Sequence, residues 1–325
     1  MHNKFIPHPC ARNPHLQTIL GSLKIRSSHH HQSLNSSKEM TIEGGHGVRL
    51  LGYHSSQPSK ISRGLVTLIH GWEGSADSTY VVSTAKYLYN NCFDIFRLNL
   101  RDHGNSHHLN EGLFHGALIE ETFNAVRNIS RLSADLPYFI IGFSLGGNFA
   151  LRIALKQSLS RIPNLAHVIA ISPALDPYKA TLAIDESLPI YRFYFLSKWK
   201  NSLRKKQALF PGRYNFKDII GLKTCMSLTE AIMPYHPDFG DYREYFHHYT
   251  LRDDAFNDLT LPVTIIASED DPIVPVHDIS GLKEHHHLHR VIQAYGGHCG
   301  FIDFFPFRCW YEREIERILC QRSCV

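Results

Sequence analysis

Short, continuously apolar runs alternate along the chain with longer stretches whose apolar residues recur at helical spacing. The apolar runs lie at 65–69, 95–100, 139–141, 168–171, 263–267 and 291–294. Runs of this length without polar alternation predict strands that are buried on both faces of a sheet. The amphipathic stretches, which predict helices covering that sheet, lie at 80–89, 117–131, 146–157 and 307–320. The pattern is typical of an α/β fold with a mostly parallel central sheet.

Two segments depart from this alternation. The glycine-rich segment 40–53 predicts an antiparallel hairpin at the sheet edge. About ninety residues separate the strand that ends at Ile171 from the strand that starts at Val263, far more than a usual connection. We therefore predict a helical cap at 176–258, inserted between the sixth and seventh strands of a single domain that spans 1–325.

Composition and charge exclude several classes of protein. The 325 residues are 43% hydrophobic and 20% charged, as in ordinary globular domains. The net charge of +4 is small and is not gathered into one basic block, so we expect no nucleic-acid partner. The densest basic run, 198–206, is expected to be the solvated face of an amphipathic helix. The seven cysteines have no paired spacing, which favours free thiols in a reducing cytoplasm.

Targeting and metal-binding signals are also missing from the sequence. Segment 1–20 has no apolar signal core, and no stretch is long and apolar enough to span a membrane. Peripheral membrane contact and the oligomeric state stay open. The 23 histidines include runs at 29–31 and 285–287, but consecutive histidines point in different directions and no HExxH or CxxC spacing is present. We expect these runs to be exposed and to bind no metal.

The strongest chemical signal is the segment Gly-Phe-Ser-Leu-Gly-Gly at 142–147, which follows a predicted strand and precedes a predicted helix. In such a turn the serine adopts strained backbone angles, and glycines on either side let strand and helix approach each other. The alternative is a glycine-rich turn with a structural serine. The position in a strand-turn-helix unit favours Ser144 as a nucleophile.

A serine hydroxyl needs a base, and the base needs a group that orients it. His298 follows the last predicted strand in a glycine-rich loop, which makes it the candidate base. The acid is expected just after the strand 263–267, where Glu269, Asp270 and Asp271 are adjacent. Asp271 is favoured because it precedes Pro272 and a short apolar segment. Asp270 is the main alternative, Glu269 is a weaker one, and Asp176, which follows an earlier strand, is a further candidate.

An acyl-transfer site also needs N–H groups that bind the developing oxyanion. We expect one from Leu145, directly after the nucleophile, and one from Trp72 in the segment His-Gly-Trp-Glu-Gly at 70–74. A simple strand-ending turn is the alternative interpretation of this segment. Asp102 and His103 end another strand and are interpreted as turn-stabilising rather than catalytic.

Five motifs together resemble the YheT-like branch of the α/β-hydrolases. They are Asn-Pro-His-Leu-Gln-Thr at 13–18, His-Gly-Trp-Glu-Gly at 70–74, Gly-Phe-Ser-Leu-Gly-Gly-Asn at 142–148, Asp-Asp-Pro at 270–272 and Gly-Gly-His-Cys-Gly-Phe at 296–301. Among these motifs, the N-terminal one is specific to this branch. The resemblance runs from about Phe5 to Phe301. It implies an α/β-hydrolase fold and cofactor-free hydrolysis of carboxylic esters by Ser144, Asp271 and His298, with short-chain or phospholipid acyl esters as substrates of some members.

Three functions are compatible with these residues. The favoured one is a serine esterase acting on small-molecule or lipid esters, and the others are an acyltransferase with the same triad and a non-catalytic binding protein of this fold. Segment 188–210 is rich in aromatic and basic residues, which predicts an amphipathic cap helix. We expect its apolar side to cover the acyl pocket beside Ser144, where Phe195 and Trp199 would help to set chain-length preference.

Overall fold

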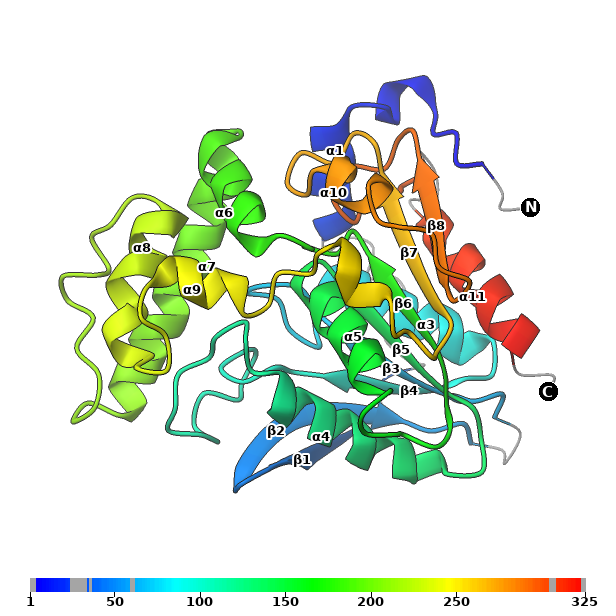
Figure 1. Cartoon of the computed structure of the whole chain (residues 1–325), viewed down its shortest axis with the longest axis horizontal. Helices are drawn as coiled ribbons and strands as arrows, with labels where there is room; N and C mark the ends of the chain where they lie inside the picture. Colours follow the sequence, from blue (N-terminus) through cyan, green and yellow to red (C-terminus); the bar gives the residue numbers. More distant parts are fainter. Residues whose placement is uncertain (1–3, 24–33, 35–36, 59–61, 304–307, 323–325) are drawn as a thin grey trace.

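An eight-stranded sheet forms the centre of the protein in the computed structural model, which describes residues 4–23, 34, 37–58, 62–303 and 308–322 (Figure 1). The strand order is β1-β2-β4-β3-β5-β6-β7-β8, and the strands from β3 onward run parallel. β1 and β2 form the predicted antiparallel hairpin at one edge. The strands are β1 (Lys38–Gly45), β2 (Val48–Ser55), β3 (Leu65–Ile69), β4 (Asp94–Leu98), β5 (Tyr138–Phe143), β6 (Leu165–Ile171), β7 (Val263–Ser268) and β8 (Leu288–Gln293).

Burial follows the position of each strand in the sheet. Every residue of β3, β4, β5 and β7 is buried, as the continuous apolar runs predict. The prediction of a doubly buried strand at 291–294 was wrong, because β8 ends at Gln293 and lies at the sheet edge, Ile292 is only half-buried and Ala294 is exposed. β4 ends at Leu98, two residues before the predicted end, because a turn with positive φ at Asp102 follows.

Helices cover both faces of the sheet and separate two apolar cores. One core includes Leu65, Ile69 and Phe149, and the other includes Val66, Leu68 and Tyr311, so alternate residues of β3 point to opposite faces. α4 and α5 pack on the first face, and α3 and α11 on the second (Figure 1). These helices are α3 (Thr79–Asn90), α4 (Ile119–Ser130) with η3 (Arg131–Ser133), α5 (Leu145–Lys156) and α11 (Trp310–Arg322).

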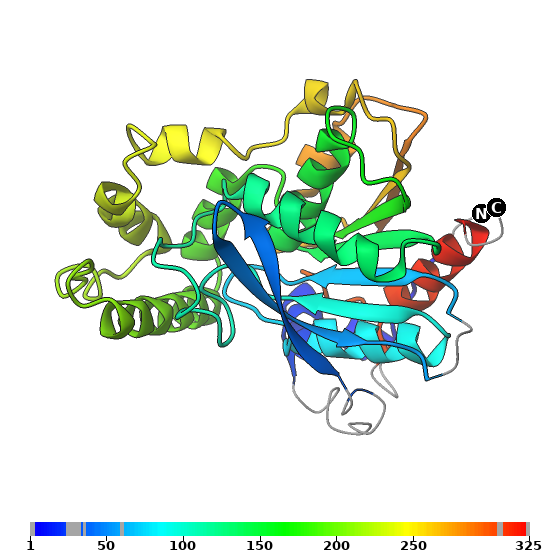
Figure 2. The same ribbon diagram turned by 90° about the horizontal axis from the view of Figure 1, so that it is seen from below.

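The insertion between β6 and β7 is helical, as predicted, and forms a lobe beside the sheet (Figures 1 and 2). Its bounds of 176–258 and the single-domain description stay predictions. The prediction that this segment forms an amphipathic helix was only partly right: α7 buries Tyr191 and Trp199, but Phe193 is 74% exposed and Tyr194 45%, so its aromatic residues do not share one side. The elements are α6 (Pro177–Glu186), α7 (Pro189–Leu209), α8 (Cys225–Ile232), η4 (Met233–Tyr235), α9 (Tyr242–His247) and η5 (Asp253–Phe256), and α10 (Val276–Ser280) follows β7.

One residue of the basic run corrects the prediction of a solvated helix face. Lys206 is fully buried, and its Nζ lies 2.7 Å from Asp102 Oδ1 and donates to the carbonyl of Asn110 at 2.6 Å. A buried ammonium is tolerated only when a carboxylate and further acceptors replace water around it. Asp102 also accepts the N–H of Phe114 at 2.9 Å, so the pair ties the cap to the loop that follows β4.

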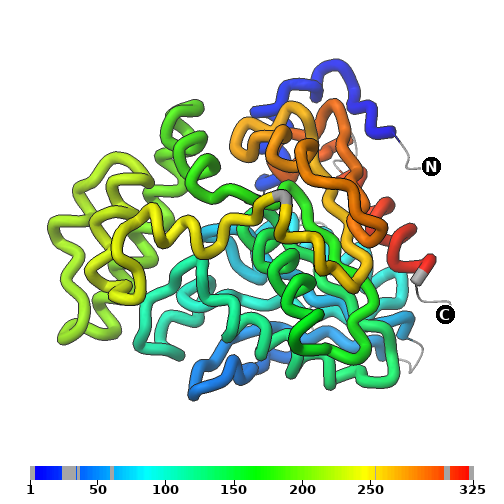
Figure 3. Tube along the Cα trace, viewed as in Figure 1, coloured from blue at the N-terminus to red at the C-terminus, as the bar shows by residue number. Residues whose placement is uncertain are grey.

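The N-terminal segment lies beside the end of the chain in space. η1 (Pro9–Ala11) and α1 (Pro14–Ser22) run next to the loops that follow β7 and β8 (Figure 3). Asn13 caps α1 by accepting the N–H of Leu16 at 3.0 Å, and Pro14 occupies the first helical position. Among the helices in the described part of the chain, none has both the length and the apolar composition that a membrane crossing needs.

Candidate active site

Ser144 occupies the sharp turn between β5 and α5. Its φ of +52° and ψ of −116° lie outside the regions that most residues favour. A Cβ on Gly142 would lie 2.0 Å from the carbonyl oxygen of Gly146, and one on Gly146 would lie 2.3 Å from that of Ile69. Both positions therefore require glycine, and the close packing holds the serine at the carboxyl edge of the sheet.

His298 and Asp271 lie next to this serine. His298 Nε2 is 2.9 Å from Ser144 Oγ, and His298 Nδ1 is 2.9 Å from Asp271 Oδ2. The side chains of His298 and Asp271 are 9% and 3% exposed. Asp271 Oδ1 accepts the N–H groups of Ile273 and Val274, both at 2.9 Å, which fixes the carboxylate. This arrangement can draw a proton from the serine hydroxyl and stabilise the imidazolium that results.

The other acid candidates make different contacts. Asp270 Oδ1 accepts the N–H of Gly297 at 2.8 Å, and burial raises the pKa of this carboxyl. Glu269 is exposed. Asp176 caps α6 by accepting the N–H of Lys179 at 3.1 Å and lies 3.6 Å from the ammonium of the same lysine. Among the four candidates, Asp271 is the one whose carboxylate lies within hydrogen-bond distance of His298.

The two residues predicted to supply oxyanion donors, Trp72 and Leu145, lie close to Ser144. Leu145 is the first residue of α5, so its N–H belongs to the helix terminus that has no intrahelical acceptor. Trp72 belongs to the turn after β3. This turn lies close to Ser144, since a Cβ added to Gly71 would be only 3.2 Å from Ser144 Cβ. The N–H of Gly71 donates to the Tyr80 hydroxyl at 3.0 Å, which holds the turn in place.

Two buried histidines behind this turn are neutral and structural. Leu100 N–H donates to His70 Nε2 at 3.2 Å, and His70 Nδ1 lies 2.7 Å from the carbonyl of Gly71. Glu73 N–H donates to His103 Nε2 at 3.2 Å. Burial lowers the pKa of His70 far below its usual value and lowers that of His103 to about 4. Both rings therefore position the loops at the carboxyl edge of the sheet rather than exchange protons near neutral pH.

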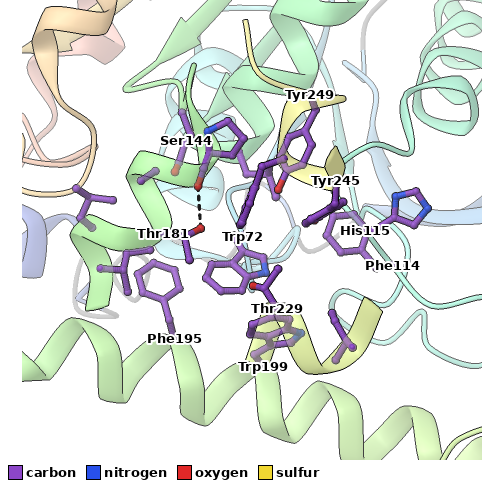
Figure 4. Close-up of a pocket in the computed structure, with 18 residues that line it drawn as sticks. Trp72, Phe114, His115, Ser144, Thr181, Phe195, Trp199, Thr229, Tyr245 and Tyr249 are labelled. Atoms are coloured by element: carbon purple, nitrogen blue, oxygen red, sulfur yellow. Dashed lines mark hydrogen bonds between the residues drawn. The ribbon is translucent and has the colours of Figure 1, made fainter. Parts of the chain in front are cut away.

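An apolar pocket extends from Ser144 beneath the cap (Figure 4). We call it the cap pocket; its volume is about 80 Å³, and Ser144, Leu145 and Ile273 belong to its lining. The ring of Trp72 stacks on Phe195 with centroids 5.3 Å apart and meets Trp199 edge-on at 4.9 Å. The cap residues Phe195 and Trp199 thus line a pocket at the nucleophile, where the sequence analysis expected them.

The N-terminal motif holds the loop of His298, a role that the sequence analysis did not assign. Thr18 Oγ1 donates to the carbonyl of Pro14 at 2.8 Å and accepts the N–H of His298 at 2.9 Å. The fully buried Gln17 donates to the carbonyl of Ile302 at 3.0 Å and accepts the N–H of the same residue at 2.6 Å. The motif at 13–18 was the signal for this role, but its partners lie about 280 residues away along the chain.

Two glycines allow α1 and the loop of His298 to approach each other closely. A Cβ on Gly297, whose φ is +55°, would lie 2.4 Å from the carbonyl oxygen of Pro14. A Cβ on Gly300 would lie 2.5 Å from the carbonyl oxygen of Gln17. α1 therefore lies directly against the histidine loop.

We expect Thr18→Val to lower kcat about tenfold on any ester that the protein turns over. Valine keeps the shape of threonine but leaves the partly buried N–H of His298 without its acceptor, a loss of about 1–3 kcal/mol that the loop relieves by moving. Steady-state kinetics check this result. Thr18→Ser is expected to restore kcat because it restores the acceptor.

The matched control for this prediction is Thr122→Val in α4. Thr122 is also buried and donates to a carbonyl four residues earlier, that of Leu118, at 3.0 Å, but it does not contact the histidine loop. The control separates loss of a helix-bound hydroxyl from loss of the acceptor for His298. Equal effects of the two valine variants, or no rescue by Thr18→Ser, would contradict a positioning role.

The histidine-rich and cysteine-containing segments add no second centre within the described residues. His29, His30 and His31 lie outside those residues. His286 is exposed, and His285 and His287 on either side of it are half-buried. Across the described part of the chain, no group of three or more His, Cys, Asp or Glu side chains is arranged to hold a metal ion, and no disulfide is formed.

Sequence comparison places the chain in a known family. The sequence profile described as the alpha/beta hydrolase fold matches residues 64–305. The chain belongs to the α/β-hydrolase family. The matched region includes β3 to β8, Ser144, Asp271 and His298, whereas α1 lies before it. Thr18 and Gln17, which hold the histidine loop, lie outside the matched region.

Individual relatives agree with this membership. The chain is 22% identical to the putative esterase YheT of Escherichia coli (strain K12), covering 92% of this chain and 87% of the relative, which confirms the YheT-like resemblance. It is 23% identical to phospholipase ABHD3 of Mus musculus over 62% of this chain and half of the relative's length.

Solved structures show the same fold at lower identity. The esterase Pf2001 of Pyrococcus furiosus has a TM-score of 0.60 and 16% identity, covering 88% of this chain and 91% of its own. Est1E of Butyrivibrio proteoclasticus, solved with ferulic acid, has a TM-score of 0.55 and 16% identity, covering 88% of this chain and all of its own. These similarities confirm the predicted fold.

Proposed function

We propose that the protein is a serine esterase that cleaves carboxylic esters through an acyl-enzyme intermediate. The observation that carries the proposal is the continuous chain of contacts from Ser144 Oγ to His298 Nε2 and from His298 Nδ1 to Asp271 Oδ2, each 2.9 Å long. The names of the relatives, a putative esterase and a phospholipase, also support hydrolysis of an ester.

The proposed reaction has two steps. Ser144 Oγ attacks the ester carbonyl while His298 Nε2 takes its proton, and the N–H groups of Trp72 and Leu145 bind the oxyanion. His298 then gives the proton to the oxygen of the leaving alcohol, the carbon–oxygen bond breaks, and the acyl group stays on Ser144. Water then attacks the acyl carbon while His298 takes a proton from it, and His298 returns that proton to Ser144 Oγ as the bond between Oγ and the acyl carbon breaks and the acid leaves. Asp271 keeps the imidazole oriented throughout, and no cofactor takes part.

The test is turnover of simple esters, followed by competition between water and an added alcohol. We expect ester cleavage with release of free acid as the main product at low alcohol concentration. Titration of the released acid and chromatography of any new ester measure the two paths. A new ester that dominates at millimolar alcohol would make the protein an acyltransferase with the same three residues. Absence of any ester turnover in folded protein would contradict the proposed function.

The remaining sequence expectations stay predictions. They are a small-molecule or lipid ester as the partner, no nucleic-acid partner, no cofactor and a cytoplasmic location.

A further inference from the structure

A second apolar pocket opens on Ser144 from the other side. It lies between α1, α7 and the turn that follows β3, and its volume is about 310 Å³. We call it the α1 pocket. It shares four lining residues with the cap pocket, namely Trp72, Ser144, Phe195 and Ile273. The candidate nucleophile therefore lies at the junction of two pockets, so the two parts of an ester can enter different ones.

The position of His298 indicates which pocket binds the alcohol part of the ester and which binds the acyl part. In ester cleavage the histidine gives its proton to the leaving alcohol oxygen, so the alcohol part lies on the side of the histidine. His298 belongs to the lining of the α1 pocket alone, and Leu145, an expected oxyanion donor, to that of the cap pocket alone, while the other expected donor, Trp72, lines both. The alcohol part then faces α1, and the acyl part enters the cap pocket.

The volumes of the pockets set the size of each part. A cavity of about 150 Å³ holds one benzene ring, or about six carbon atoms. By this measure the cap pocket, at about 80 Å³, holds an acyl group of about two to four carbons. The α1 pocket, at about 310 Å³, holds about twelve carbon atoms. The larger part of the ester is therefore the alcohol.

The walls of the α1 pocket set the chemistry of that alcohol. Ile19 and Leu23 come from α1, and Ile190 and Tyr194 come from α7. The described residues that line this pocket include no Asp, Glu, Lys or Arg. A charged alcohol part would lose its hydration there without gaining a partner of opposite charge.

We propose that the α1 pocket binds the alcohol part of the substrate and that the substrates are short-chain acyl esters of large, uncharged, apolar alcohols. This proposal rests on the esterase function proposed above. Cleavage releases the apolar alcohol from the α1 pocket and leaves the short acyl group on Ser144 for hydrolysis by water.

The test compares two isomeric esters, octyl acetate and methyl nonanoate. They have the same atoms and nearly the same hydrophobicity, and they differ in which side of the ester carries the long chain. We expect kcat/KM for octyl acetate to exceed that for methyl nonanoate by at least about tenfold, since each CH₂ that enters an apolar pocket contributes up to about fourfold. Preference for methyl nonanoate, or equal rates, would overturn the assignment.

Two matched variants of α1 test the pocket directly. Ile19 and Leu16 lie on the same helix and are both 37% exposed, but Ile19 belongs to the lining of the pocket and Leu16 does not. We expect Ile19→Trp to lower the ratio of kcat/KM for octyl acetate to that for methyl acetate by about tenfold. Leu16→Trp is expected to leave this ratio unchanged. If the two tryptophan variants gave the same ratio, the α1 pocket would not bind the alcohol.

A variant of the cap tests the acyl side. Trp199 lines the cap pocket and not the α1 pocket, so Trp199→Ala enlarges the cap pocket directly, while the stacking on Phe195 still holds the ring of Trp72, which both pockets share. We expect kcat/KM for methyl nonanoate to rise about tenfold relative to that for methyl acetate, while the preference between octyl acetate and methyl acetate is kept. A shift confined to the alcohol series would reverse the assignment of the pockets.

Failure of this inference can be distinguished from failure of the esterase function. Reaction of Ser144 with a fluorophosphonate and turnover of methyl acetate report the esterase function alone. A protein that reacts and turns over esters but prefers methyl nonanoate remains an esterase with the opposite pocket assignment. A folded protein that neither reacts nor turns over any ester overturns the function and the pocket assignment together.

Discussion

Ser144→Ala is expected to abolish reaction with a fluorophosphonate and to lower ester turnover by at least about 10⁴-fold. The hydroxyl is the atom that attacks in the proposed mechanism, and loss of one member of such a triad leaves only the contribution of the oxyanion donors and substrate binding. Intact-protein mass spectrometry of the wild type should show one added phosphonyl group per chain, and peptide mapping should locate it on Ser144.

The control for this variant is Ser130→Ala. Ser130 is buried at the end of α4 and donates to the carbonyl of Arg127 at 2.8 Å. Its loss removes a buried hydroxyl without touching the candidate site, so labelling and turnover should stay at the wild-type level. Unchanged labelling of folded Ser144→Ala would exclude this serine as the nucleophile.

Asp271→Asn is expected to lower kcat by about 10⁴-fold, whereas Asp270→Asn should lower it by no more than about tenfold. The N–H groups of Ile273 and Val274 both donate to Asp271 Oδ1, so an asparagine must place its amide oxygen there. The amide NH₂ then takes the place of Oδ2 and faces His298 Nδ1. Because Oδ2 is the nearer of the two oxygens to His298 Nδ1, at 2.9 Å against 3.2 Å for Oδ1, this exchange favours the tautomer that accepts at Nδ1 and carries its proton on Nε2, where it cannot serve as a base for Ser144.

Asp270→Asn is the matched control, since it makes the same chemical change one residue earlier. Its amide oxygen can still accept the N–H of Gly297, which Asp270 Oδ1 accepts at 2.8 Å. Circular dichroism and thermal unfolding establish that both variants are folded, and kcat on one ester gives the ranking. The opposite ranking in two folded variants would move the acid role to Asp270.

The secondary structure and the strand-turn-helix position of Ser144 followed from the sequence because both depend on neighbours along the chain. A continuous apolar run can be buried on both faces only as a strand in a covered sheet, and β3, β5 and β7 are such strands. The turn at Ser144 needs glycine at 142 and 146 for steric reasons that act within a few residues. Local patterns therefore predicted the strand-turn-helix unit and the fold class.

The position of a strand within the sheet could not be predicted from its neighbours along the chain. β8 lies at the edge, and its exposed His289 reflects the lack of a neighbour on one side. The buried pair of Lys206 and Asp102 joins residues about a hundred positions apart, and hydrophobic spacing alone placed the lysine on a solvated face. In both cases burial depends on which distant element packs there.

In the candidate site, too, some features followed from the sequence and others only from the folded structure. The sequence by itself determined the order of Ser144, an acid and His298, and the loops that carry them. The tertiary structure alone decided that Asp271 rather than Asp270 faces His298, because adjacent side chains leave the chain in different directions and only the path of the loop selects one. It also brought Thr18 to His298 and placed α1 and α7 around a second pocket, since these contacts form between segments that meet only in the folded chain.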